Sequence, residues 1–257
     1  MLFRSDQLKQ TFHLKEVFVS PNLVDDEEIN LRDTCRALAG NLDKYIIDNT
    51  VVAVSWGNTL NCLAGQIQPL KAKDIKVVQL NGGVAKSASS TGASQIVDAL
   101  TMAGHGIGYM FPVPAIVDSK HTSEILQEET QVKNVLRLAK EAEVSIFSIG
   151  ALSKDSILYE VEYLKDEDFQ ALEKNKAVGD IASRYFDING NIALKELDDR
   201  VVGFGLEELR EKEWTIAIAV GVNKVDAIIG ALRAGFMNVL YTDEKTAREI
   251  LNRNLLG

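Results

Sequence analysis

A strand-like apolar run at residues 51–54 leads directly into a polar turn that contains Ser55, Gly57, Asn58 and Thr59. When a helix follows such a turn, its first backbone N–H groups have no partner within the helix and point toward one place. The helix dipole adds roughly half a positive charge there, and the side chains of the turn add hydroxyl and amide donors. These residues predict a binding site for the phosphate group of a small metabolite.

Two further candidates follow other expected strands. Gly82 and Gly83 come after the apolar segment 75–80 and either line a ligand or serve only a return turn, for which glycine is common. Lys224 opens an expected helix, where a cation is unfavourable for the helix dipole. Its ammonium group therefore requires a nearby anion, which is either a ligand phosphate or the carboxylate of Asp226.

Asp118, Asp180 and Arg184 are polar residues at expected turns or element ends. Asp180 and Arg184 stand four positions apart, so they either bind sugar hydroxyls or form an ordinary surface ion pair with each other. Lys86 shortly follows the glycine pair, and it either approaches a sugar carbonyl or is a solvated lysine. The hydroxyl-binding roles are therefore expectations that compete with simple ion pairing.

The sequence offers little for catalysis or metal binding. The three histidines lie far apart, and Cys35 and Cys62 do not supply metal-ligand spacing. We find no order of Ser, His and Asp typical of a triad and no GxxxxGK[ST] signature. We therefore predict no catalytic residue, no metal and no cofactor.

Composition narrows the class of protein. The 257 residues carry a net charge of −9, which argues against a direct nucleic-acid partner, because phosphate backbones select basic surfaces. Two cysteines without a disulfide framework indicate a reduced setting. The amino terminus lacks a signal-peptide core, and the longest apolar run, residues 216–222, is too short to span a bilayer. We expect a cytoplasmic protein with no membrane partner.

Strand-like and helical segments alternate along most of the chain. Regularity weakens between about 151 and 200, where residues 187–190 indicate a hairpin-type turn, and residues 108–114 are expected to be extended. The alternation predicts an α/β fold with a doubly wound, largely parallel sheet, whose ligands bind at the carboxyl ends of the strands. The expected strands are 15–19, 51–54, 75–80, 144–149, 201–204, 214–220 and 238–241, and the expected helices are 25–47, 60–67, 94–103, 119–142 (one or two helices), 224–234 and 244–255.

Five ordered blocks resemble a known family. The blocks are VSWGNTL at 54–60, QLNGG at 79–83, residues 112–119, GDIASRYFD at 179–187, and GVNK at 221–224 with AIIGALR at 227–233 and LYTDE at 240–244. From about residue 8 to its end the chain resembles the effector-binding domain of SorC/DeoR-type bacterial transcriptional regulators. The resemblance implies a Rossmann-like fold related to sugar-phosphate isomerases of the NagB and ribose-phosphate isomerase type.

The resemblance also implies a ligand and its contacts. The ligand would be a phosphorylated sugar that alters operator affinity. Gly57, Asn58 and Thr59 would hold its phosphate together with Lys224. Its sugar part would be lined by Gly82 and Gly83, and its hydroxyls would be read by Asp180 and Asp118. The chain departs from the family pattern at Gly221-Val-Asn223, where a glycine pair is common, and at Ser183, where glycine is frequent before the arginine.

Regulators of this kind carry an amino-terminal helix-turn-helix module. By the resemblance, residues 1–16 are expected to be the remnant of a linker to that module, which is absent from this chain, and residues 17–257 to be the effector-binding domain. DNA would then be contacted only through the absent module. Relatives of this kind assemble, so we expect a homodimer or homotetramer.

Two enzymatic alternatives are weaker. A sugar-phosphate isomerase on the same fold needs a carboxylate or histidine that moves a proton between adjacent carbons. Asp180 could serve, but the chain lacks the acid-rich Asp-Gly-Ala-Asp-Glu loop expected of ribose-phosphate isomerases. A dinucleotide-binding dehydrogenase needs a G-x-G-x-x-G after its first strand, and the sequence has none there. The sequence therefore favours a non-catalytic sensor.

Overall fold

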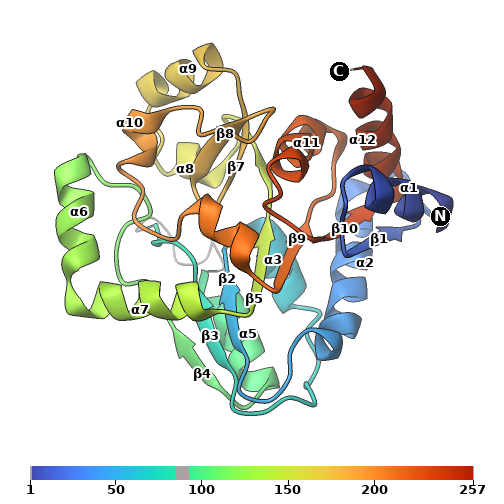
Figure 1. Ribbon diagram of the computed structural model, residues 1–257, viewed down its shortest axis with the longest axis horizontal. Helices are drawn as coiled ribbons and strands as arrows, with labels where there is room; N and C mark the ends of the chain where they lie inside the picture. The colour runs from blue at the N-terminus through green and yellow to red at the C-terminus, as the bar shows by residue number, and fades with distance from the viewer. Residues whose placement is uncertain (1, 85–92, 257) are drawn as a thin grey trace.

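The computed structural model describes residues 2–84 and 93–256. A seven-stranded sheet with the order β1-β10-β9-β5-β2-β3-β4 forms the centre of the molecule (Figure 1). Every neighbouring pair of strands in it is parallel, so the expected doubly wound, largely parallel sheet is confirmed. Its strands are β1 (Glu16–Ser20), β2 (Val51–Val54), β3 (Lys76–Gln79), β4 (Ile107–Tyr109), β5 (Val144–Ser148), β9 (Trp214–Ile218) and β10 (Val239–Asp243).

The order of the strands reverses between β2 and β5. From β2 the chain continues through β3 to β4 at one edge, and then returns to β5 on the other side of β2. From β5 it continues in the opposite direction through β9 to β10. Ligands of open α/β sheets bind in the crevice at the carboxyl ends of the strands where the order reverses. The topology therefore directs attention to the residues that follow β2 and β5.

Helices cover both faces of the sheet because its strands are apolar on both sides. In β2, Val52 and Val54 join one buried core and Ala53 joins the other. The first core lies under α2 (Glu27–Asn41), α3 (Asn58–Ala64) and α5 (Ala93–Ala103). The second core lies under α1 (Leu2–Thr11), α7 (Thr130–Glu141), α11 (Val225–Arg233) and α12 (Glu244–Leu256). A further helix, α6 (Lys120–Glu128), packs against α7.

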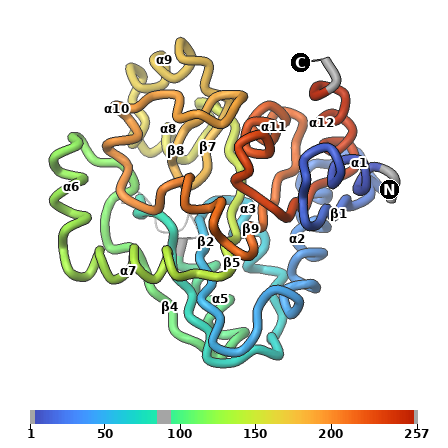
Figure 2. Tube along the Cα trace, in the orientation of Figure 1, coloured from blue at the N-terminus to red at the C-terminus, as the bar shows by residue number. Residues whose placement is uncertain are grey.

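The first and last helices of the chain lie side by side (Figure 2). Helix α1 packs against α12, and Arg4 of α1 forms an ion pair with Glu244 of α12. Strand β1, which follows α1, pairs in parallel with β10, which precedes α12. The segment that precedes β1 therefore packs against the last helix of the chain.

A second, three-stranded antiparallel sheet occupies the region of weak regularity. Its order is β6-β7-β8, with β6 (Gly150–Ala151), β7 (Ala177–Ile181) and β8 (Arg184–Asp187). Short helices α8 (Ile157–Glu160), α9 (Asp166–Lys174) and α10 (Lys195–Asp198) surround it. A separate apolar core that includes Leu164, Phe169 and Leu172 holds these elements together. The small sheet is thus a compact addition beside the carboxyl ends of the large one.

Two local predictions in this part of the chain had different outcomes. The turn at 187–190 is confirmed, since the N–H of Gly190 donates to the Asp187 carbonyl at 2.9 Å. The strand expected at 201–204 is wrong. Val201 forms a single bridge with Ile116 and Gly203 a single bridge with Asn81. The segment crosses two different partners instead of running beside one, so no ladder of consecutive residue pairs forms.

Candidate functional site

A cavity of about 290 Å³ lies between the two sheets, at the ends of β2 and β5. Its position matches the reversal of strand order described above. On the side of the large sheet the lining residues are Ser55, Trp56, Gly57, Asn58, Thr59, Asn81, Ser148, Ile149, Asn223 and Lys224. On the side of the small sheet they are Gly150, Ala151, Ser153, Asp155, Ser156, Ile157, Leu158, Asp180, Ala182 and Ser183.

The turn after β2 forms one end of this cavity. The N–H of Ser55 donates to Ile146 at 3.1 Å and so extends the pairing of the sheet by one residue. Gly57 then adopts a φ of +129°, a conformation that side chains disfavour, and its carbonyl accepts the first helical hydrogen bond from Asn61 at 2.9 Å. Helix α3 therefore begins at the cavity, with Asn58 exposed and Thr59 buried.

Lys224 and Asp180 bring opposite charges into the same cavity from different elements. Lys224 lies between β9 and α11, and burial lowers the pKa of its ammonium group against the opposing charges of Glu27 and Asp180. Burial raises the pKa of Asp180 to about 6, although the N–H of Ser183 and the charge of Lys224 oppose this change. Asp226, the alternative partner considered for Lys224, pairs with Arg253 at 2.9 Å. Lys224 itself lines the cavity.

Gly82 and Gly83 lie beside the cavity and contact a neighbouring chain segment. The N–H of Gly83 donates to Val113 at 2.9 Å. A Cβ on Gly82 would lie 2.4 Å from the carbonyl oxygen of Pro114, so the backbones approach too closely for any side chain. The Gly82 carbonyl also accepts a hydrogen bond from the indole of Trp56 at 2.8 Å. The glycine pair therefore positions the tryptophan that forms part of the cavity wall.

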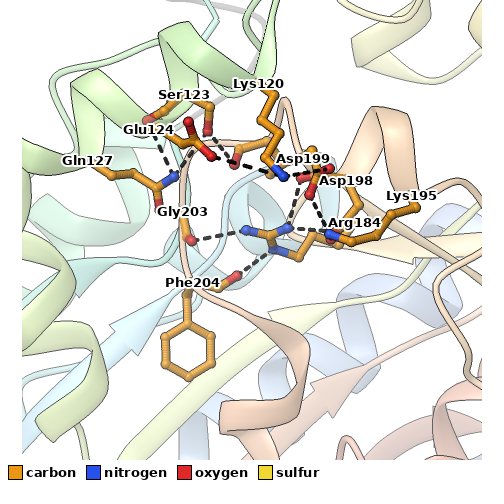
Figure 3. Close-up of polar contacts among 11 residues, drawn as sticks. Lys120, Ser123, Glu124, Gln127, Arg184, Lys195, Asp198, Asp199, Gly203 and Phe204 are labelled. Atoms are coloured by element: carbon orange, nitrogen blue, oxygen red, sulfur yellow. Dashed lines mark hydrogen bonds and ion pairs between the residues drawn. The ribbon is translucent and has the colours of Figure 1, made fainter.

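Arg184 does not line the cavity, and its guanidinium lies among Asp198, Gly203 and Phe204 (Figure 3). Its guanidinium donates to the carbonyls of Phe204 at 2.8 Å and Gly203 at 3.1 Å. It also forms an ion pair of 2.6 Å with Asp198, and both side chains are mostly buried. All of these partners belong to the segment that returns the chain from the small sheet to the large one. The arginine therefore fastens that segment in place.

Asp118 is a surface residue. Its side chain is 94% exposed and pairs with Lys165 at 3.5 Å. The structure thus brings part of the predicted set together in the cavity and leaves Gly82, Gly83, Asp118 and Arg184 outside its lining. Lys86 lies outside the described residues. The residues that the cavity collects from the predicted set are Ser55, Gly57, Asn58, Thr59, Asp180 and Lys224, and their binding roles stay predictions.

Several lining residues were not singled out from the sequence. Ser148 ends β5, and Ser153, Asp155 and Ser156 follow it. A run of hydroxyl and carboxyl side chains at the end of a buried strand is a signal that could have identified them. Asn81 stands directly before the glycine pair and was overlooked beside it. Short polar residues at the carboxyl ends of strands are therefore the useful signal in this fold.

Comparison with known proteins identifies the class. A family model described as "Putative sugar-binding domain" matches residues 1–252. The deoxyribonucleoside regulator of Bacillus subtilis is 32% identical over 95% of this chain and 78% of its own length. The chain therefore belongs to the sugar-binding domain family of SorC/DeoR-type transcriptional regulators, which confirms the resemblance.

Solved structures agree with this assignment. A DeoR family transcriptional regulator from Listeria monocytogenes superposes with a TM-score of 0.89 and 27% identity, covering 97% of this chain and 98% of the other. A transcriptional regulator from Streptococcus pneumoniae superposes with a TM-score of 0.92 and 25% identity, covering 99% and 97%. The Rossmann-like fold is thereby confirmed, and the relatives favour a regulator over an isomerase. Within the described residues, no helix has the length and apolar character needed to cross a membrane.

Proposed function

We propose that this domain senses a phosphorylated sugar, which binds in the cavity between the two sheets and alters the DNA binding of a helix-turn-helix module outside this chain. One observation carries the proposal. The donor-rich turn at 55–59 and the ammonium of Lys224 come from distant parts of the sequence and line one cavity at the reversal of strand order. Membership of the sugar-binding family supplies the sugar part of the ligand.

The lining suggests how the ligand is oriented. Its phosphate would lie at Gly57, Asn58 and Thr59, with Lys224 supplying the positive charge that a phosphate dianion favours. Asp180 lies within the electrostatic influence of Lys224 and would accept hydrogen bonds from sugar hydroxyls. Sugar hydroxyls would then donate to the carboxylate of Asp180, and repulsion between the two negative charges would keep the ligand's phosphate away from Asp180.

Regulation would follow from the effector's preference for one arrangement of domains or subunits. A coupling free energy of 1–3 kcal/mol would change operator affinity by roughly 5–150-fold. We propose residues 17–257 as the effector-binding domain and residues 1–16 as the connection toward the DNA-binding module. Because α1 packs against α12, a movement of residues 1–16 would also displace α12 and so couple the connection to the rest of the domain. We also propose assembly as a homodimer or homotetramer.

A thermal-shift screen tests the proposal. The panel holds ribose 5-phosphate, deoxyribose 5-phosphate, fructose 6-phosphate and glucose 6-phosphate, each beside its unphosphorylated parent sugar. Ligands that bind only the folded state raise its melting temperature by mass action. We expect stabilisation by at least one phosphorylated member, weaker stabilisation by its parent, and no turnover of it by NMR. Turnover would assign the chain to the isomerase class, and no shift with any phosphorylated sugar would contradict the proposed ligand.

A further inference from the structure

Asn81 is a buried polar residue at the end of β3, and it lines the cavity. Only 2% of the residue is exposed. Its backbone is fixed by an isolated bridge to Gly203. Its side-chain Nδ2 donates to the hydroxyl of Ser183 at 3.0 Å, across the cavity wall from the large sheet to the small one.

The other end of the same carboxamide has no partner. Among the described residues, Oδ1 of Asn81 accepts no hydrogen bond although it is buried. Since Nδ2 is engaged by Ser183, the amide plane is held and Oδ1 stays in place as an acceptor. Buried acceptors are normally paired, so an unpaired acceptor on a residue that lines the cavity marks a position where a ligand can supply the donor.

Ser183 is itself held in an unusual conformation. Its φ is +69°, in a region that residues other than glycine seldom adopt. Its N–H donates to Oδ2 of Asp180 at 3.1 Å, while its hydroxyl accepts from Asn81. The three residues therefore form one chain of contacts, in which Ser183 links the carboxamide of Asn81 to the carboxyl group of Asp180. Both groups call for hydrogen-bond donors.

We infer that Asn81, positioned by Ser183, is a specificity-determining residue that accepts a hydrogen bond from a hydroxyl of the ligand's sugar part. A second phosphate at this wall would have almost no hydrogen to donate and would face Asp180. The preferred ligand is therefore a sugar monophosphate with free hydroxyls at this end, and a sugar bisphosphate is rejected. This inference rests on the proposed function.

Calorimetric titration of four proteins tests the inference: the wild type, Asn81→Ala, Ser183→Ala and Asn30→Ala. Asn30 is a matched control, because it is 4% exposed and its Oδ1 also lacks a partner among the described residues, but it does not line the cavity. The probes are ribose 5-phosphate, fructose 6-phosphate, fructose 1,6-bisphosphate and inorganic phosphate.

The wild type should bind one sugar monophosphate at least about 10-fold more tightly than the bisphosphate. Asn81→Ala should lower the affinity for that monophosphate about 10-fold, as expected for the loss of one buried hydrogen bond. Its affinity for inorganic phosphate should stay within about twofold of the wild-type value. Ser183→Ala should produce a smaller loss of the same selective kind, because the amide is then free to rotate. Asn30→Ala should change neither the affinity for the monophosphate nor the affinity for inorganic phosphate.

Each remaining result overturns the inference in a recognisable way. Unchanged monophosphate affinity in Asn81→Ala, or an equal loss in Asn30→Ala, would show that Asn81 does not read the sugar. If the wild type binds the bisphosphate as tightly as the monophosphate, the inferred preference for sugar monophosphates is wrong. If Asn81→Ala does not fold, Ser183→Ala decides by its ratio of monophosphate to inorganic phosphate affinity. A wild type that binds no sugar phosphate would overturn the proposed function as well.

Discussion

The two walls of the cavity are built by opposite means. The wall from the large sheet rests on parallel strands whose residues are buried on both faces, as in β5, where Val144 to Phe147 are all buried. The wall from the small sheet ends in a two-residue turn, in which Ala182 and Ser183 have φ values of +51° and +69°. That wall also carries the partly buried Asp180.

The difference shows where stability and binding reside. Backbone strain and a buried carboxyl both cost folding free energy, and they persist at functional sites when the surrounding structure holds them. In this domain the large sheet and the Arg184 contacts supply that support. We therefore expect substitutions in the supporting contacts to change only the stability of the domain. Substitutions in and beside the small-sheet turn should change both its stability and its affinity for the ligand.

The largest effect is expected for Arg184→Met. The change leaves Asp198 as a buried charge without its arginine and frees two buried carbonyls, so unfolding free energy should fall by about 3–5 kcal/mol. Chemical denaturation measures the loss. Arg137→Met, which removes an exposed pair with Glu141, should cost less than about 1 kcal/mol. Similar losses for both variants would contradict the supporting role of Arg184.

Asp180→Asn should stabilise the domain. Because the folded pKa of Asp180 is raised to about 6, above the ordinary value near 3.9, the folded state binds the proton more tightly. Stability from this group therefore falls as pH rises from about 4 to 6, and stays lowered above pH 6. The variant should gain up to about 3 kcal/mol at pH 7, and the gain should shrink as pH approaches 4. A lower melting temperature at pH 7 would refute the expectation.

Lys224→Met tests the phosphate end of the cavity. Loss of a charge-assisted contact should weaken the binding of a phosphorylated sugar by about 1.5–3 kcal/mol, which is roughly a 10–150-fold loss of affinity. The unphosphorylated parent sugar should lose much less, because it presents no charge to the lysine. Calorimetry with both sugars gives the comparison. Equal losses for the two would place Lys224 at the sugar instead of the phosphate.

Thr59→Val should weaken the binding of the phosphorylated sugar by about 1 kcal/mol, the net contribution of one hydrogen bond. Thr34→Val is a matched control, because Thr34 is also buried in a helix and its hydroxyl donates to the Asn30 carbonyl within that helix. The control should affect stability but not affinity. Full affinity in Thr59→Val, with the fold intact, would remove the Thr59 hydroxyl from the site.

The smallest effect is expected for Ser183→Gly. Glycine relieves the left-handed conformation by about 1 kcal/mol, but the buried Nδ2 of Asn81 loses its acceptor, so the net change in unfolding free energy, measured by denaturation, should be small. The same change removes the hydroxyl that holds Asn81, so affinity for the sugar monophosphate should fall. A variant that gains stability and keeps full affinity would separate the strained turn from ligand binding.

The large sheet could be predicted because its elements are regular. The segments expected at 51–54 and 144–149 match β2 and β5 within one residue, since buried parallel strands are apolar runs that end at turn residues. The turn at 55–59 followed from the same logic. The contribution of a separate chain segment, Lys224, could be guessed only from its place at a helix start.

The small sheet could not be read in the same way. Strand β6 has only two residues, and β7 and β8 mix charged and apolar positions, so no period stands out. Asp180 and Arg184 belong to one hairpin, yet the first lines the cavity and the second contacts Asp198. Which of the two residues meets a ligand depends on the path of residues 198–204, and local sequence carries no information about that path.

Amide chemical-shift mapping with a phosphorylated sugar tests the central claim most directly. Backbone resonances of the 15N-labelled domain would be followed during titration with the sugar phosphate that stabilises it most. The largest changes should fall on residues 57–59 and 180–183, with a smaller change at Lys224. Changes concentrated elsewhere, such as the surface between Lys140 and Lys212 that lines a separate hollow, would contradict binding between the two sheets.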